Sequence, residues 1–197
     1  MAQAKLKPLT FAEYLNYDDS SDIRYDLLSN GKIIPVLNES EENDYLAMVL
    51  FMKLSVLISF RLVKPHTLTM EVEPVGDRYK NCRPDLVVLE PEHLQLESII
   101  KQNALPLGVI PPQFIAEVVS PGNESSDNYR RDYEWKRQQY EQWGIPEYWI
   151  LDPMRSQVSV LTLVNGIYND QCYSGDQVIV SETFPTLQLT PNSLFDS

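Results

Sequence analysis

Apolar residues recur along the chain with the spacing of helices in some segments and of strands in others. Thr10-Phe11-Ala12-Glu13 has the Ser/Thr-x-x-Glu form of a capping box, which predicts that a short helix begins at Thr10. Ile23 to Leu28 and Lys32 to Leu37 flank Asn30-Gly31, a dipeptide that readily takes positive φ at both central positions of a turn. This arrangement predicts a β-hairpin.

The most apolar stretch runs from Tyr45 to Phe60 and is interrupted by Lys53. The pieces on either side of Lys53 are much shorter than the ~20 residues that cross a bilayer, so the stretch predicts a buried core helix and no membrane span. The acidic segment from Glu39 to Asp44 precedes it, where negative charge complements the partial positive charge of a helix N-terminus.

The rest of the chain alternates short strand-like runs with two helices. The predicted strands are Thr67 to Glu73, Asp85 to Leu89, Phe114 to Val119, Glu147 to Leu151, Gln157 to Val164, Ile167 to Tyr173 and Asp176 to Val180. One helix is predicted near His93 to Gln102, and another is capped by Asp127 and runs to about Trp143, where Gly144 stops it. Asn165-Gly166 predicts a second hairpin turn. These elements predict an α/β (α+β) fold with a central mixed β-sheet, formed as one domain over residues 1–197.

Composition fits a globular protein, with 43% hydrophobic and 22% charged residues. The two cysteines, Cys82 and Cys172, lie far apart and form no zinc-like cluster with the two histidines. The segment Met1 to Lys5 turns polar at once and lacks the apolar run of a secretory signal. Together these features predict a cytoplasmic protein.

The formal net charge of -12 counts against a nucleic-acid partner, because such binding is driven by the release of counterions from phosphates. An acidic protein that binds nucleic acid must concentrate its positive charge locally. Four of the 16 Lys and Arg residues lie within one short helical segment, at Arg130, Arg131, Lys136 and Arg137. This basic patch partly answers the objection, although Asp132 and Glu134 dilute it and a solvated helix face is the commoner explanation.

Glu117 lies within the predicted strand from Phe114 to Val119, and strand alternation places it on the same face as Ile115 and Val119. Burial of an ionised group without a partner is so costly that such a glutamate must be paired, protonated or bound to a metal ion. The alternative is a glutamate at the end of a sheet that reaches solvent.

Asp85 opens a buried strand directly after Arg83-Pro84, and the proline biases Arg83 toward extended geometry. An aspartate that caps a strand end is common, so Asp85 alone is weak support for a site. Asp85 and Glu117 on adjacent strands are stronger, because hard divalent cations such as Mg²⁺ favour oxygen ligands.

Lys136 belongs to an aromatic stripe of its predicted helix. At about 100° per residue, the positions within roughly 40° of Tyr129 are occupied by Tyr133, Lys136, Tyr140 and Trp143. The pattern places Arg130, Arg131, Arg137, Glu134, Gln138 and Glu141 elsewhere. Lys136 is therefore expected to face inward, with a snorkelling lysine as the alternative.

Several segments resemble one known family in combination. They are Arg83-Pro84-Asp85-Leu86-Val87-Val88, Glu117-Val118-Val119-Ser120-Pro121, Lys136 to Tyr140, and Gly144-Ile145-Pro146-Glu147-Tyr148-Trp149-Ile150-Leu151-Asp152-Pro153. They resemble the Uma-type endonucleases, formerly a domain of unknown function, of the restriction-endonuclease-like PD-(D/E)XK superfamily. The resemblance extends from about Thr10 to about Val180.

The resemblance implies a restriction-endonuclease-like domain with helices flanking a mixed sheet, and a metal-dependent endonuclease that hydrolyses phosphodiester bonds in DNA. By the same resemblance, Asp85 and Glu117 would bind Mg²⁺, or Mn²⁺ in its place, with the Val118 carbonyl as a further ligand. Lys136 would orient or help deprotonate the attacking water and stabilise charge on the scissile phosphate. This chemistry agrees with the general behaviour of metal ions held by carboxylates.

The chain departs from the superfamily at one position. The usual lysine lies two residues after the glutamate on the same strand, and that position is Val119 here. Lys136 would have to replace it from the following helix. In this superfamily a second acid can come from the early helix, and Glu42 is the candidate here.

Two other functions remain open at this point. The net charge of -12 and Val119 favour a catalytically inactive descendant of the nuclease fold that binds nucleic acid or protein. A carboxylate-pair glycoside hydrolase ranks last, because Lys136 has no evident role in that chemistry. Apolar surface on the terminal strands suggests a homodimer.

Overall fold

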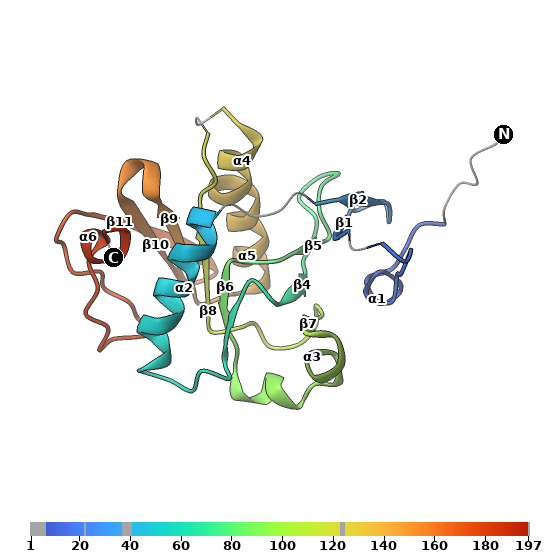
Figure 1. Cartoon of the computed structure of the whole chain (residues 1–197), viewed down its shortest axis with the longest axis horizontal. Coiled ribbons are helices and arrows are strands. Elements are labelled where there is room, and N and C mark those ends of the chain that lie inside the picture. The colour runs from blue at the N-terminus through green and yellow to red at the C-terminus, as the bar shows by residue number, and fades with distance from the viewer. Residues whose placement is uncertain (1–6, 22, 37–40, 123–124, 197) are drawn as a thin grey trace.

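The computed structural model describes residues 7–21, 23–36, 41–122 and 125–196 (Figure 1). The strands are β1 (Tyr25–Leu27), β2 (Ile33–Pro35), β3 (Val63–Pro65), β4 (Thr69–Glu71), β5 (Asn81–Cys82), β6 (Leu86–Val88), β7 (Ala104–Leu105), β8 (Phe114–Val118), β9 (Glu147–Asp152), β10 (Gln157–Val164) and β11 (Ile167–Ser174). The helices are α1 (Phe11–Leu15), α2 (Glu41–Ser55), the 3₁₀ turn η1 (Pro91–Gln95), α3 (Glu97–Gln102), α4 (Asp127–Arg130), the π-helical turn η2 (Arg131–Lys136), α5 (Arg137–Trp143), the 3₁₀ turn η3 (Pro153–Arg155) and α6 (Pro191–Phe195).

The central sheet has six strands in the order β11-β10-β9-β8-β6-β3. Strands β8 and β9 are parallel and every other neighbouring pair is antiparallel, so the predicted mixed sheet is confirmed. Because side chains alternate along each strand, the sheet separates two apolar cores. One core includes side chains of α2 and α6, and the other includes side chains of α5 and of the small sheet β5-β4-β7.

The N-terminal predictions are confirmed in outline. Thr10 and Glu13 form the capping box of α1, and β1 and β2 form an antiparallel hairpin. The turn differs from the prediction, because Gly31 takes a positive φ of 75° and Asn30 does not. The Asn30 side chain instead accepts a hydrogen bond from the backbone N–H of Lys32. A Cβ at Gly31 would lie 2.6 Å from the Cβ of Pro8, so both the backbone angle and the close approach require glycine.

The apolar stretch that begins at Tyr45 forms a core helix, as predicted, but α2 starts at Glu41 and ends at Ser55, so Val56 to Phe60 lie outside it. The helix packs against β8 and α6. Leu46, Leu50 and Leu54 are buried in the core, and the acidic side chains Glu41, Glu42 and Asp44 occupy the first turn. Within the described part of the chain, no helix has the length and apolar character needed to cross a membrane.

The helix predicted from Asp127 to Trp143 is present, with two differences. Ser126, one residue earlier, is the N-cap, because its side chain accepts a hydrogen bond from the N–H of Tyr129. The middle of the helix is the π-helical turn η2, which widens the turn just before Lys136. Gly144 ends the helix with a positive φ of 85°, as predicted.

In the C-terminal third, the structure confirms one predicted hairpin and contradicts one predicted strand. Asn165 and Gly166 both take positive φ, as the predicted turn between β10 and β11 requires. The strand predicted from Asp176 to Val180 is wrong. Ile179 is buried in the core, as the alternation indicated, but these residues form no strand in the described structure. Their backbone donates from Gln177 to Ser174 in the turn after β11 and from Ile179 to Leu189.

The two cysteines differ sharply in environment. Burial, with the Glu117 carboxylate nearby, raises the pKa of the Cys82 thiol to about 12, whereas Cys172 is exposed on β11. Since the thiolate is the reactive form, we expect one fast-reacting thiol per native chain and two after denaturation. A titration with an aromatic disulfide reagent measures this, and Cys172→Ser should remove the fast phase. Two fast thiols in the native protein would contradict this burial of Cys82.

Candidate active site

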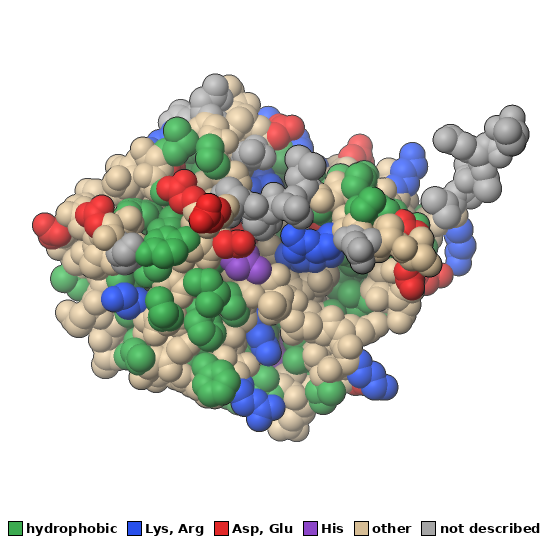
Figure 2. Space-filling model, in the orientation of Figure 1, with side chains coloured by type: hydrophobic (Ala, Val, Ile, Leu, Met, Phe, Trp, Pro, Cys, Tyr) green, Lys and Arg blue, Asp and Glu red, His purple; other side chains and the backbone are tan. Residues whose placement is uncertain are grey.

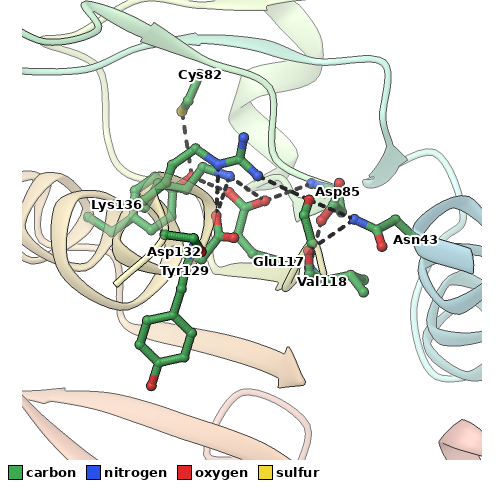
Figure 3. A network of polar contacts seen from close by, with 12 residues as sticks. Asn43, Cys82, Asp85, Glu117, Val118, Tyr129, Asp132 and Lys136 are labelled. Atoms are coloured by element: carbon green, nitrogen blue, oxygen red, sulfur yellow. Dashed lines mark hydrogen bonds and ion pairs between the residues drawn. The ribbon is translucent and has the colours of Figure 1, made fainter. Parts of the chain in front are cut away.

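Asp85 and Glu117 lie on neighbouring antiparallel strands, with Asp85 immediately before β6 and Glu117 in β8. The Asp85 Oδ2 accepts a hydrogen bond of 2.6 Å from the N–H of Val118. The Glu117 Oε2 lies 3.3 Å from the N–H of Asp85, which donates to it. Both carboxylates are buried, and these backbone bonds hold them side by side. Figure 3 shows them between α2 and the helix of Lys136.

Lys136 reaches the two carboxylates from η2. Its Nζ lies 2.8 Å from the Glu117 Oε2 and 3.0 Å from the Asp132 Oδ1. Burial alone lowers the pKa of Lys136, but the carboxylates of Asp132 and Glu117 outweigh burial and raise that pKa above its usual value. Lys136 is therefore a buried cation that faces the carboxylates, as the aromatic stripe predicted.

Glu117 has a second donor from the same stripe. The Tyr140 hydroxyl donates to the Glu117 Oε1 at 2.6 Å. Burial nevertheless raises the pKa of Glu117, with Lys136 and Tyr140 opposing the increase. The fold thus holds this carboxylate in a position where its ionised form is costly. Strand alternation predicted the inward face of Glu117 correctly, since Ile115 and Val119 share its core.

Asp132 is a site residue that the sequence pattern missed. Its side chain is fully buried at 0% exposure, with one oxygen bound to Lys136 and to the Arg131 Nε. The other oxygen, Oδ2, is buried without a hydrogen-bond partner in the described structure. In the sequence Asp132 counted as a charge that dilutes a basic patch, and its spacing of four residues from Lys136 was the signal that would have found it.

Arg131 was expected to point away from the stripe, and that expectation is wrong. Its Nη2 donates to the Ser120 hydroxyl at 3.3 Å, and its side chain lines the cavity beside Asp85. The Asp132 carboxylate fixes the guanidinium from the other side at 3.2 Å.

Glu42 does not reach the site. Its side chain is exposed in the first turn of α2, and the next residue, Asn43, is buried instead. The Asn43 Nδ2 donates to the Val118 carbonyl at 3.2 Å and to the Ser120 hydroxyl at 3.4 Å. The early helix therefore contributes an amide to the carbonyl that the sequence indicated as a ligand.

His66 adjoins the carboxylates from the loop after β3. Its Nδ1 lies 3.4 Å from the Asp85 Oδ1 and its Nε2 lies 3.4 Å from the Asp44 Oδ1. Its backbone takes a positive φ of 49°, which is uncommon for a residue with a side chain. Its backbone N–H donates to the Asp85 carbonyl, so this turn is tied to the start of β6.

The cavity beside these residues has a volume of about 100 Å³ and separates the N-terminal hairpin from the helix of Lys136. Its basic lining residues are Arg24, Arg78, Arg83, Arg131 and Lys136, and its acidic ones are Asp26 and Asp85. The Arg78 guanidinium lies 3.2 Å from the centroid of the Trp135 ring, which supports it by a cation–π contact. Positive charge is thus concentrated at this cavity although the chain as a whole is acidic.

Arg83 has a structural role in this lining. Its guanidinium donates to the Thr69 hydroxyl, the Asp26 carboxylate and the Tyr25 carbonyl. These bonds attach the N-terminal hairpin to the small sheet and so form one wall of the cavity.

The donors at the site suit a hard cation. Two carboxylates and the Val118 carbonyl are oxygen donors, which Mg²⁺ prefers, and this ion usually keeps several waters. No group of three or more His, Cys, Asp or Glu side chains in the described ranges is arranged to hold a metal ion. A cation here would therefore rely on few protein ligands and on water.

The chain is similar to known proteins over nearly its whole length. The family model Uma2, described as "Putative restriction endonuclease", matches residues 11–192. The fold is similar to the crystal structure of a "putative nuclease belonging to DUF820" from Anabaena variabilis, with a TM-score of 0.67, 18% sequence identity, and coverage of 96% of this chain and 98% of that chain. No protein in the curated set matches at a significant level. The family resemblance and the predicted fold are both confirmed, and the chain belongs to the Uma2 family of putative restriction endonucleases.

Proposed function

We propose that this chain is a Mg²⁺-dependent endonuclease that hydrolyses phosphodiester bonds in DNA. The observation that carries the proposal is the contact of 2.8 Å between the Lys136 Nζ and Glu117, next to Asp85 and at the edge of the cavity. A metal-dependent nuclease site needs carboxylates that can hold a metal ion, at a surface that a phosphate can reach. A lysine beside these carboxylates can contact the same phosphate.

The distribution of charge supports a nucleic-acid substrate. The whole chain has 16 Lys and Arg against 28 Asp and Glu residues, but the lining of the cavity reverses this ratio. Arg24, Arg78 and Arg131 approach the cavity from three different segments. A local excess of arginine attracts phosphate even in an acidic protein. This local concentration supports the proposal despite the net charge.

Asp85 and Glu117, with the Val118 carbonyl, would hold the metal ion. Bound there, Mg²⁺ would supply a water of lowered pKa and positive charge beside the phosphate. Asn43 donates to the Val118 carbonyl from α2. Tyr140 and the N–H of Val118 orient the two carboxylates.

Lys136 would act as a cation in this mechanism. Its pKa is raised by Asp132 and Glu117, which favours donation of hydrogen bonds to the attacking water and the scissile phosphate over removal of a proton. Val119 is buried in the core and its N–H bonds to the Leu151 carbonyl, so the strand position used elsewhere in the superfamily is filled by packing. The helix supplies the ammonium group to the same carboxylate.

Cleavage of supercoiled DNA with Mg²⁺ or Mn²⁺ tests the proposal. Wild-type protein should nick or cut the DNA, and Asp85→Asn should reduce the rate to background because it removes a metal-binding charge. Asp127→Asn is the matched control, since Asp127 is exposed at the start of α4. Cleavage that survives Asp85→Asn would refute the assignment of this site.

Calorimetry separates the proposal from an inactive binding protein of the same fold. Binding of Mg²⁺ or Mn²⁺ at millimolar concentration, lost in Asp85→Asn, is expected for the nuclease. A folded protein that binds neither ion and cuts no DNA would favour the inactive alternative.

A further inference from the structure

The outer face of α2 carries a line of exposed apolar side chains. Tyr45, Met48 and Met52 of α2, with Val56 directly after its last residue, are here called the α2 stripe; they recur at the spacing of one helix face and are 48%, 42%, 59% and 82% exposed. Phe60, in the turn that follows, is 67% exposed. Figure 2 shows hydrophobic side chains gathered over α2 and the segment after it.

This helix is apolar on its inner face as well, where Leu46, Leu50 and Leu54 enter the core. A helix that is hydrophobic all round is normally buried on both sides. The described helices include none that could cross a membrane. Contiguous apolar surface of this kind marks an interaction site.

The charges at the two ends of α2 identify the partner. The first turn carries the exposed acids Glu41 and Glu42, and the last turn carries the exposed Lys53. At about 100° per residue, Glu42 and Lys53 lie on the same flank of the α2 stripe. A twofold axis that packs α2 against itself in antiparallel orientation brings the acidic first turn of one copy to the basic last turn of the other. The two helix dipoles also oppose each other in this arrangement.

We propose that a second copy of this chain docks on the α2 stripe, forming an antiparallel α2 pair across a twofold axis. Met48 and Met52 can adapt their shape to such a self-complementary contact. The same helix carries Asn43 and Asp44, which contact Val118 and His66, so each candidate active site would border the interface. The inference rests on the surface of α2 and does not depend on nuclease activity.

Sedimentation velocity measures the outcome directly. Wild-type protein should sediment at micromolar concentration with twice the 22.7 kDa mass of the chain. Met52→Glu should raise the dimer dissociation constant on the order of 100-fold, because it buries an unpaired charge at the centre of the contact. Met154→Glu is the matched control, since Met154 is 65% exposed on η3 and Met52 is 59% exposed on α2.

Two further variants locate the contact. Glu42→Lys should weaken the dimer, and the added change Lys53→Glu should restore it, because both ends of each helix then exchange their charges. Ile167→Glu, on the edge strand β11, should leave the dimer intact. A monomeric wild-type protein, or a dimer that is separated by Ile167→Glu and not by Met52→Glu, would overturn the proposal.

Discussion

Lys136→Ala should abolish DNA cleavage and also lower the free energy of unfolding by about 3–5 kcal/mol. The rate loss, on the order of 10³-fold, follows from removal of the cation that faces the scissile phosphate. The stability loss follows from the two buried carboxylates, Glu117 and Asp132, that share Lys136 at 2.8 and 3.0 Å. Without the ammonium group, Glu117 keeps only neutral hydrogen-bond donors and Asp132 keeps only Arg131 as a cationic partner, in a buried site. Cleavage assays and urea unfolding measure the two effects.

Arg137→Ala is the control for this variant. Arg137 follows Lys136 in the same helix, but its pairing with Asp170 lies at the surface, where such a contact contributes about 0–1 kcal/mol. Lys136→Met, which keeps the length of the side chain, should show the same activity loss if the alanine variant does not fold. Retained cleavage in a folded Lys136→Met protein would exclude Lys136 from the mechanism.

Glu117→Gln should abolish Mg²⁺ binding and cleavage and lower stability at neutral pH less than Lys136→Ala does. The amide keeps the shape of the side chain and its oxygen can accept from Tyr140, while Lys136 keeps Asp132 as a partner. Its NH₂ group loses the hydrogen bond that Oε2 accepts from the N–H of Asp85. Burial raises the pKa of Glu117, so the folded protein disfavours its ionised form. Calorimetry and the cleavage assay measure the loss, and urea unfolding measures the stability.

The difference in stability between Glu117→Gln and wild type should change with pH in one direction. Because the pKa of Glu117 is higher in the folded than in the unfolded chain, protonated Glu117 stabilises the fold fully below the ordinary pKa of glutamate. This contribution is lost as the pH rises through the raised pKa. The stability of Glu117→Gln relative to wild type should therefore increase from acidic to neutral pH.

Glu134→Gln is the control, since Glu134 pairs with Arg130 on the exposed face of the helix. A Glu117→Gln protein as unstable as Lys136→Ala would show that the ionised carboxylate stabilises the fold, against the argument from burial. Mg²⁺ binding that persists in the variant would exclude Glu117 as a ligand.

Local patterns in the sequence were sufficient for most of the elements. Capping residues and Gly144 determined the ends of helices, and alternation placed Glu117 on an inner face, because both signals depend on neighbours in sequence. The same reasoning failed for the strand predicted from Asp176 to Val180. Alternation identifies a buried face, but a strand also needs a partner, and partners are determined by the whole sheet.

The sequence by itself determined the family, the pair Asp85 and Glu117, and the inward direction of Lys136. Only the tertiary structure decided which atoms meet them. Asp132 and Arg131 meet beside Lys136 in η2, and one step along α2, about 100° of rotation, places Asn43 at Val118 and leaves Glu42 exposed. The basic lining of the cavity likewise comes from segments far apart in the chain, because the N-terminal hairpin packs opposite the helix of Lys136. Periodicity specifies a face, whereas a site depends on how several faces pack together.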